Sequence, residues 1–526
     1  MCYNISVAKK KEIIILLIIL AIAAFFRFFE LADIPPGLYP DVAINGNDAL
    51  DALKTGDFKV FYPENNGREG LFINLIALSF LIFGPSILAI KIVAAVIGIL
   101  TVFGLYLLTK ELFKKTPIAL LSAFFLATSF WHTNFSRIGF RGILVPFILV
   151  FSSYFLFRAL RTNKLSDFII SGVFFGLGFY TYISFRMAVL ILPAIIIPFW
   201  FVCKKNKVQK KYLFSVFYFL FSIFLVALPI GLYFLDNPQD FISRAGGVSI
   251  FAQENPFKAF FESFIKHLGM FNIRGDGNWR HNFADAPMLS WPVGIFFLIG
   301  LVISIKDLFL LRKEKNYFRF YVLCFMLSWF LAMLLPGILT YEGVPHALRV
   351  IGVVPALYIF AGLGAFWFIE KAKPLTKNLK LFFIFYFLLF ALSGYAEYDK
   401  YFVDWAKHPT TSDEFSKEKV EIGLYLNSLT DNIEKFVIIN EAGVPAPWPD
   451  GLPMPAQTPM FIERTVFNEP QAAYLKENEL DKIKPAKKAV IIPIRFDKEL
   501  FDKLKELHPE GEAKKENGVW IYLIKK

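Results

Sequence analysis

The stretch at residues 34–56, IPPGLYPDVAINGNDALDALKTG, concentrates carboxylate and amide side chains directly after a long apolar run. These side chains belong to Asp41, Asn45, Asn47, Asp48 and Asp51. A carboxylate can act as a general base, because it accepts the proton that a hydroxyl group loses as it attacks an electrophilic carbon. The alternative is structural: Asp is a preferred N-cap residue, and Asp41 would cap a short helix that ends at Gly56. The residues alone leave both roles open.

A helix over this stretch would carry a polar stripe. Asp41, Asn45 and Asp48 are separated by four and three positions, so they would share one face, and Asp51 would extend it. Such a stripe is normal for a surface helix. It suits equally well a helix whose polar side closes a water-filled cleft.

A second group of chemically capable residues consists of Arg and His in the loops between apolar runs. NNGREG contains Arg68 beside Glu69, SRIGFRG contains Arg137 and Arg141, IRGDGNWRHN contains Arg274, Arg280 and His281, and EGVPHALR contains His346 and Arg349. Arginine binds phosphate oxygens through paired, charge-assisted hydrogen bonds. The alternative is that these residues contact lipid headgroups or pair with nearby acids. Four Arg-bearing loops on the side where basic residues are disfavoured point to an anion site.

Other cofactor motifs are missing from the sequence. We find no Walker A loop, no dinucleotide fingerprint and no H-E-x-x-H zinc motif. His281 and His346 lack the spacing of metal ligands, so we expect no metal, while a divalent ion held by acids of the first loop stays an open alternative. Glycines in GFYTYISFR and GLGAFWF predict close helix packing.

The composition is that of a membrane protein. The chain has 526 residues, 56% of them hydrophobic, and a mean hydropathy of +0.51, which is too apolar for a soluble globular protein. The formal net charge of +12 comes from basic residues in short loops between apolar runs, as the positive-inside rule requires, so it does not indicate nucleic-acid binding. Three scattered cysteines, Cys2, Cys203 and Cys324, predict neither a disulfide framework nor a thiolate metal site.

About eleven apolar segments are expected to cross the bilayer, because one helical span needs about 20 apolar residues. The first, residues 13–31, follows a basic N-terminus, and we expect an uncleaved helix with the N-terminus inside. The others are centred on residues 86–109, 117–134, 142–160, 168–185, 187–203, 213–235, 290–310, 320–340, 350–369 and 379–395. Every alternate loop is basic, which agrees with this topology.

The predicted fold is mainly α: a polytopic bundle of membrane helices over residues 1–396, followed by a small extracytoplasmic α/β domain at 397–526. Residues 32–85 form the first outside loop, in which LFINLIALSFLIFG predicts a helix lying along the surface, and residues 236–289 form the second. In the C-terminal domain, helical patterns (EKVEIGLYLNSL, DKELFDKLKEL) alternate with strand patterns (KFVIIN, KAVIIPI, GVWIYLI). VPAPWPDGLPMPAQTP is expected to be a loop.

Five segments occur in a defined order: PPGLYPDVAINGNDAL, FYPENNGREGLFINLIALSFLIFGPS, WHTNFSRIGFR, YTYISFR and LLPGILTYEGVPHALR. Together, over roughly residues 12–395, they resemble the GT-C-type membrane glycosyltransferases that use polyprenyl-phosphate sugars. Within these, the chain looks like the superfamily of protein mannosyltransferases and aminoarabinose lipid A transferases. The first outside loop of that superfamily carries an Asp, usually followed by Glu, and the resemblance implies that Asp41 is the catalytic base. Val42 stands where the second acid is usual, and Asp48 or Glu69 would replace it.

The resemblance implies an inverting glycosyltransferase in the cytoplasmic membrane. It would move a sugar from a polyprenyl-phosphate donor to an acceptor hydroxyl of a protein, lipid or glycan on the outer face. The leaving phosphate departs charged and needs cations rather than a general acid. Seven residues are candidates to bind it: Arg68, Arg137, Arg141, Arg280, His281, His346 and Arg349. Arg137 and Arg349 are the first choices, because they lie at the ends of spans.

Two other classes of function are compatible with parts of the sequence. A transporter or flippase of a lipid-linked glycan would also need many spans and outside cations, but ionisable residues in mid-membrane and internal repeats would be expected. A non-catalytic scaffold that presents the C-terminal domain is the third alternative. The glycosyltransferase remains our interpretation of choice.

Overall fold

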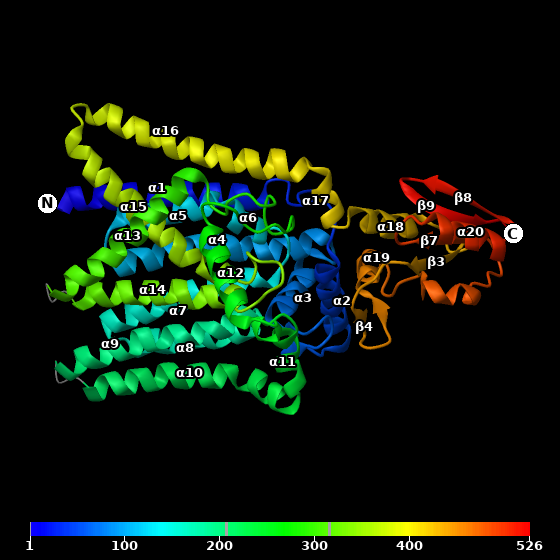
Figure 1. The fold of residues 1–526 in the computed structure, drawn as a ribbon, viewed down its shortest axis with the longest axis horizontal. Coiled ribbons are helices and arrows are strands. Elements are labelled where there is room, and N and C mark those ends of the chain that lie inside the picture. Colours follow the sequence, from blue (N-terminus) through cyan, green and yellow to red (C-terminus); the bar gives the residue numbers. More distant parts are fainter. Residues whose placement is uncertain (1, 206–208, 314–316, 526) are drawn as a thin grey trace. The chain divides into compact units, whose positions relative to one another are not determined.

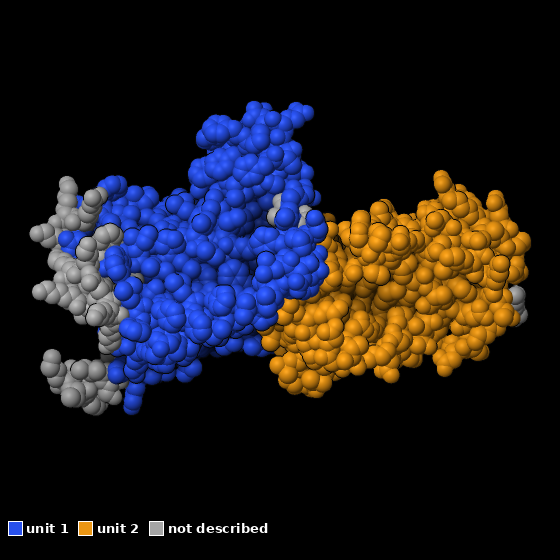
Figure 2. Space-filling view, turned by 90° about the horizontal axis from the view of Figure 1, so that it is seen from below, with its two compact units in different colours: residues 1–30, 94–405 blue, residues 31–93, 406–526 orange. Residues whose placement is uncertain are grey.

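The computed structural model describes residues 2–205, 209–313 and 317–525. The chain divides into two compact units, one of residues 1–30 with 94–405 and one of residues 31–93 with 406–526 (Figure 2). Residues 32–85, the expected first outside loop, therefore share a unit with the C-terminal residues. The expected division into residues 1–396 and 397–526 stays a prediction.

The larger unit, residues 1–30 with 94–405, is helical (Figure 1). The helices up to residue 236 are α1 (Cys2–Phe28), α4 (Ile87–Phe113), α5 (Thr116–Thr128), α6 (Phe130–Phe135), α7 (Leu144–Thr162), α8 (Leu165–Leu177), α9 (Leu192–Lys205) and α10 (Gln209–Asp236). Of α4, residues 94–113 belong to this unit. They are followed by α11 (Pro238–Gly247), α12 (Pro256–Gly269), α13 (Trp291–Lys313), α14 (Tyr317–Ile338), α15 (Val354–Ala372) and α16 (Leu379–Tyr398).

Among the described residues, seven helical segments are long and apolar enough to cross a membrane. They are Ile87–Phe113, Arg141–Thr162, Leu213–Asp236, Trp291–Leu311, Tyr317–Ile338, Ile351–Leu375 and Leu379–Trp405. The predicted mainly helical membrane bundle is confirmed, whereas the count of about eleven is not. Part of the difference is local: the expected span at 117–134 is divided at Ser129, whose hydroxyl oxygen accepts a hydrogen bond from His132 N and caps α6.

Helices α13 and α15 approach each other closely through two glycines. A Cβ atom on Gly364 would overlap the carbonyl oxygen of Phe296, and one on Gly300 would overlap the carbonyl oxygen of Phe360. Small residues allow such backbone contact between membrane helices. The prediction that the glycine of GLGAFWF serves helix packing is therefore confirmed for Gly364.

We expect Gly364→Ala to destabilise the helical unit, because the added methyl group forces α13 and α15 apart. Gly231→Ala is the matched control on α10, since nothing lies within 4 Å of the position of its Cβ atom. Thermal unfolding of both variants in detergent measures the difference. Equal melting temperatures for the two variants would contradict the importance of this contact.

The smaller unit combines the first loop with an α/β fold. The loop contains α2 (Pro40–Thr55), the short antiparallel pair β1 (Phe61–Tyr62) and β2 (Arg68–Glu69), and α3 (Leu71–Phe83). The C-terminal part has α17 (Pro409–Glu414), α18 (Lys417–Ser428), α19 (Gln457–Arg464) and α20 (Lys498–Leu507). Its strands are β3 (Glu434–Ile439), β4 (Pro445–Ala446), β5 (Leu452–Pro453), β6 (Ala473–Lys476), β7 (Ala489–Pro493), β8 (Gly511–Glu516) and β9 (Val519–Ile524).

A five-stranded sheet with the order β6-β3-β7-β9-β8 organises this part of the unit. Strand β3 is parallel to β6 and β7, while β9 is antiparallel to β7 and β8. Alternate residues of β3 face opposite cores: Val437 packs in a cluster with Leu426 of α18, and Ile438 in a cluster with Leu500 of α20. The predicted α/β domain is confirmed, including all five segments that the patterns assigned to helix or strand.

Candidate functional site

Helix α2 places Asp41 in its first turn. The N-cap is Tyr39 rather than Asp41, and Pro40 occupies the first helical position, where its missing N–H costs nothing. The expectation that Asp41 caps the helix is therefore wrong, whereas the expected end at Gly56 is confirmed by its left-handed φ of 76°. Asp41 is half-buried, and no described residue forms a hydrogen bond or ion pair with its carboxylate. The helix dipole favours a negative charge at this position.

The next acid of α2, Asp48, pairs with a buried arginine of β2. Asp48 Oδ2 lies 2.6 Å from Arg68 Nη1, and the Arg68 side chain is fully buried. Arg68 also donates from Nη1 to Asn45 Oδ1 over 2.9 Å and from Nε to the carbonyl oxygen of Glu64 over 3.1 Å. Burial raises the pKa of Asp48, while the Arg68 charge opposes that rise. The pair joins α2 to the β1–β2 segment.

The other polar residues of α2 bind α19. Asn47 Nδ2 donates to Gln457 Oε1 over 2.9 Å, and Arg464 Nη2 lies 2.5 Å from Asp51 Oδ1. Glu69, the second predicted supporting acid, is buried in β2. Asp41 is thus the acid of α2 that the described part of its unit leaves without a partner. The roles of Asp41, Asp48, Glu69 and Arg68 in catalysis stay predictions.

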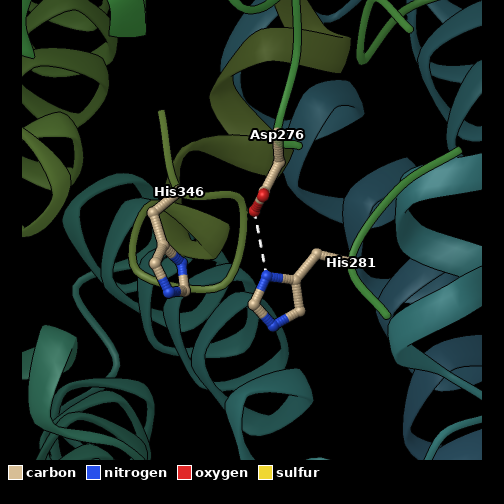
Figure 3. A group of neighbouring side chains, drawn as sticks. All are labelled: Asp276, His281 and His346. Atoms are coloured by element: carbon tan, nitrogen blue, oxygen red, sulfur yellow. Dashed lines mark hydrogen bonds and ion pairs between the residues drawn. The ribbon is translucent and has the colours of Figure 1, made fainter. Parts of the chain in front are cut away.

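In the helical unit, Asp276 joins two loops, and it is not among the site residues predicted from the sequence. Asp276 accepts hydrogen bonds at Oδ2 from His281 Nδ1 (2.9 Å) and from Ala347 N (2.7 Å), and at Oδ1 from Asn278 N (2.7 Å). Asp276 and His281 are 2% and 4% exposed. The His346 ring lies beside them, with its centroid 4.8 Å from that of His281 (Figure 3). The structure therefore brings together His281 and His346 from loops that are far apart in sequence.

These three side chains could hold a metal ion. Asp276, His281 and His346 each offer one ligand atom, and these atoms lie within 4.8 Å of one another. No local motif indicates this group, because its side chains come from two loops and follow no local spacing.

A further histidine, His267 of α12, supports the loop that carries His346. Its Nδ1 donates to the carbonyl oxygen of Ser263 over 2.8 Å, and its Nε2 accepts from His346 N over 3.2 Å. Both ring nitrogens are therefore engaged. Burial lowers the pKa of His267 to about 4, so this side chain is neutral at physiological pH.

The two arginines that ranked first as phosphate ligands have protein partners. Arg137 is fully buried and donates to the carbonyl oxygens of Phe26 (3.1 Å), Phe29 (2.7 Å) and Glu30 (3.1 Å), where α1 ends. This geometry is that of a cationic helix C-cap. Arg349 Nη1 donates to Thr340 Oγ1 over 2.9 Å and to the carbonyl oxygen of Glu342 over 2.6 Å.

The side chains of the other two arginine candidates in this unit, Arg141 and Arg280, are partly exposed. The Arg141 guanidinium lies 5.2 Å from the centre of the Tyr182 ring, and its side chain is half-exposed. Arg280 is also half-exposed, and its carbonyl oxygen accepts from Asn134 Nδ2 over 2.7 Å. Phosphate binding by Arg141, Arg280 and Arg349 stays a prediction, and the geometry of Arg137 favours a structural role.

A family model and a curated relative each match part of the chain. Residues 71–230, under a third of the chain, match the family model described as dolichyl-phosphate-mannose-protein mannosyltransferase. A curated relative, "Putative mannosyltransferase YkcB" of Bacillus subtilis (strain 168), is 30% identical over 134 residues. That alignment spans 26% of this chain and 18% of the length of the relative.

Two solved structures share the fold over nearly the whole chain. ArnT from Cupriavidus metallidurans in the apo state has a TM-score of 0.58 and 11% identity, and covers 98% of both chains. The same protein bound to undecaprenyl phosphate has a TM-score of 0.57 and 12% identity, and covers 97% of both chains. The protein is therefore a multi-pass membrane protein with the fold of the GT-C-type glycosyltransferases, and the resemblance seen in its sequence is confirmed.

Proposed function

We propose that the protein is an inverting membrane glycosyltransferase with Asp41 as its catalytic base. It transfers a sugar from a polyprenyl-phosphate donor to a hydroxyl group of a protein, lipid or glycan on the outer face of the cytoplasmic membrane. The C-terminal α/β domain lies on the same side. The mannosyltransferase family match and the ArnT-like fold support a transferase of this class.

The proposal rests on the Asp41 carboxylate, which has no hydrogen-bond or ion-pair partner among the described residues. Asp48 and Asp51 of the same helix are paired with Arg68 and Arg464, so their carboxylates serve structure. Asp41 is half-buried and has no partner among the described residues. A carboxylate that is fixed on a helix and free of ion pairs is suited to accept a proton from a substrate hydroxyl. The next residue, Val42, is apolar and buried, with 2% of its surface exposed. This position therefore supplies no second acid beside Asp41.

The chemistry requires one base and a cationic site. As the acceptor oxygen attacks the anomeric carbon, its proton passes to Asp41, and the bond between that carbon and the phosphate oxygen breaks. The polyprenyl phosphate leaves with its charge, so no general acid is needed. Basic side chains stabilise the developing charge, as oxyanion-binding groups do in other enzymes, and Arg141, Arg280, His346 and Arg349 are the candidates for this role.

The donor class can be tested by ligand binding. ArnT has been solved with undecaprenyl phosphate, which makes this lipid the natural probe. We expect undecaprenyl phosphate to raise the melting temperature of the purified protein in detergent, because a ligand that binds the folded state stabilises it. Undecaprenol, which lacks the phosphate, is the control. Equal shifts with both lipids would argue against a phosphate-binding site.

Transfer itself is tested without a second compartment. Purified protein in detergent is incubated with radiolabelled polyprenyl-phosphate sugars and an extract of cell-envelope acceptors. We expect label to move from the lipid to an acceptor. A transporter or flippase would leave all label on the lipid, and this result would overturn the proposal.

A further inference from the structure

We propose that Trp448 binds a sugar ring of the acceptor by stacking, so that the acceptor of this protein is a carbohydrate. This inference deepens the proposed function and rests on it, because it selects one class among the acceptors named there. Four observations support it: the exposure of Trp448, the support of its backbone, its place beside α2 and the charges around it.

Trp448 stands at the tip of a short hairpin in the Pro-rich segment. Strands β4 and β5 pair antiparallel, and Gly451 N donates to the carbonyl oxygen of Pro447 over 2.7 Å, which closes the turn between them. Trp448 is 71% exposed, and Pro447 and Pro449 on either side of it are exposed as well. The tip is therefore an apolar patch centred on an indole ring, a side chain that is enriched at binding surfaces.

The backbone that presents the ring is fixed by the rest of the unit. Trp448 N donates to Glu64 Oε2 over 2.9 Å, and the carbonyl oxygen of Glu64 in turn accepts from Nε of the buried Arg68. On the other side of the turn, the carbonyl oxygen of Asp450 accepts from Lys476 Nζ over 2.8 Å. A ligand that stacks on Trp448 meets a preorganised loop, so binding does not have to order that loop first.

The hairpin packs against the helix that carries the proposed base. Ala446 of β4 and Met454 form one buried cluster with Ile44 of α2, and β4 is drawn beside α2 in Figure 1. Ile44 follows Asp41 by three positions, so the two side chains are neighbours on the surface of α2. A sugar ring on Trp448 is thereby held next to the part of α2 from which Asp41 acts.

The charges around Trp448 favour a ligand rich in hydroxyl groups. The carboxylates of Glu64 and Asp450 accompany the ring, and among the described residues neither forms an ion pair. Ionised carboxylates only accept hydrogen bonds, and sugar hydroxyls donate them. Two negative charges also repel phosphates and anionic lipid headgroups, which argues against a contact of this tip with an anionic membrane surface.

Stacking matches the shape of a sugar ring. The face of an indole is flat, apolar and negative in its quadrupole. The C–H groups on one face of a pyranose ring are apolar and carry a small positive charge. The two faces therefore attract each other and exclude water, while the hydroxyl groups at the rim of the sugar stay free to reach Glu64 and Asp450.

The test measures carbohydrate binding alone, with fluorescently labelled full-length protein in detergent. The probe is an array of immobilised neutral oligosaccharides of hexoses and N-acetylhexosamines, followed by a titration of the best-bound one. We expect the wild type to bind, and we expect binding roughly 10-fold weaker in Trp448→Ala. Trp448→Tyr keeps an aromatic face and should bind nearly as the wild type does. The hairpin survives both changes, because its bond to Glu64 comes from the backbone N–H.

Trp291→Ala is the matched control. Trp291 is 68% exposed, begins α13 in the other unit and belongs to a segment that is apolar enough to cross a membrane. This variant should bind oligosaccharides as the wild type does. Absence of oligosaccharide binding by the wild type, or unchanged binding by Trp448→Ala, would overturn the inference.

A second measurement separates a sugar platform from a lipid contact. In nanodiscs with brominated lipids, the fluorescence lost in Trp448→Phe reports whether the Trp448 ring touches lipid, and we expect no quenching of it. Quenching equal to that of Trp291 would overturn the inference and place Trp448 at the bilayer interface. Array binding needs neither donor nor Asp41. Intact oligosaccharide binding without transfer would thus contradict the proposed function alone, and transfer with binding independent of Trp448 would contradict this inference alone.

Discussion

Asp41→Asn is expected to reduce the rate of sugar transfer by roughly 10²–10⁴-fold, the contribution typical of a general base. Asparagine has the shape of aspartate but cannot accept the proton of the attacking hydroxyl. The fold should be unaffected, because no described residue depends on the Asp41 carboxylate for a hydrogen bond or ion pair. Initial rates of transfer from a labelled polyprenyl-phosphate sugar measure the effect.

Asp51→Asn is the control on the same helix. The Asp51 carboxylate is 57% exposed and pairs with Arg464, whose side chain is 8% exposed. The asparagine oxygen can still accept a hydrogen bond from Arg464, so the rate of transfer should stay close to that of the wild type. A near-normal rate of transfer by Asp41→Asn would contradict the assignment of Asp41 as the base. A similar loss in both variants would point to the electrostatics of α2 rather than to proton transfer.

Arg68→Met is expected to have the largest effect on stability. Arg68 is fully buried, and the side chain of its partner Asp48 is 19% exposed. Removing one member of a buried ion pair leaves the other charge uncompensated, which costs about 3–5 kcal/mol. Arg274→Met is the matched control, since Arg274 and Asp285 form a two-pronged pair that is 74% and 52% exposed. Exposed pairs contribute about 0–1 kcal/mol.

Thermal unfolding of both variants in detergent compares the two losses. The double variant Arg68→Met, Asp48→Leu should recover much of the stability, because replacing both members of a buried pair by apolar residues is often neutral. Equal melting temperatures for Arg68→Met and Arg274→Met would show that the buried pair contributes no more than a surface pair. Failure of the double variant to recover would assign the loss to Asn45 and Glu64 instead.

The secondary structure could be predicted where the signal is local. The five helix and strand segments of the α/β domain follow from the periodicity of their apolar residues, and α3 follows from one apolar run. The position of Asp41 could also have been predicted better. Proline favours the first helical position, so Pro40 indicates that the cap is Tyr39.

The contacts between distant residues could not be predicted from a single sequence. The bond from Ala347 N to Asp276 joins residues 71 positions apart, and nothing in either loop indicates the other. The burial of Arg137 depends on where α1 ends, more than 100 positions earlier. Hydropathy identified apolar segments but not their lengths as helices, because Ser129 ends one helix and caps the next inside a single apolar run.

Helix α2 packs against α19 through the contacts of Asn47 with Gln457 and of Asp51 with Arg464, which lie more than 400 positions away. This arrangement sets an order of events during synthesis. The ribosome completes α2 early, but the partners that hold it appear only near the end of translation. Until then the segment with Asp41 lacks its final support, so we expect no full activity before the last fifth of the chain has folded. Truncated products that end before α19 should therefore be inactive even when all their membrane helices are inserted.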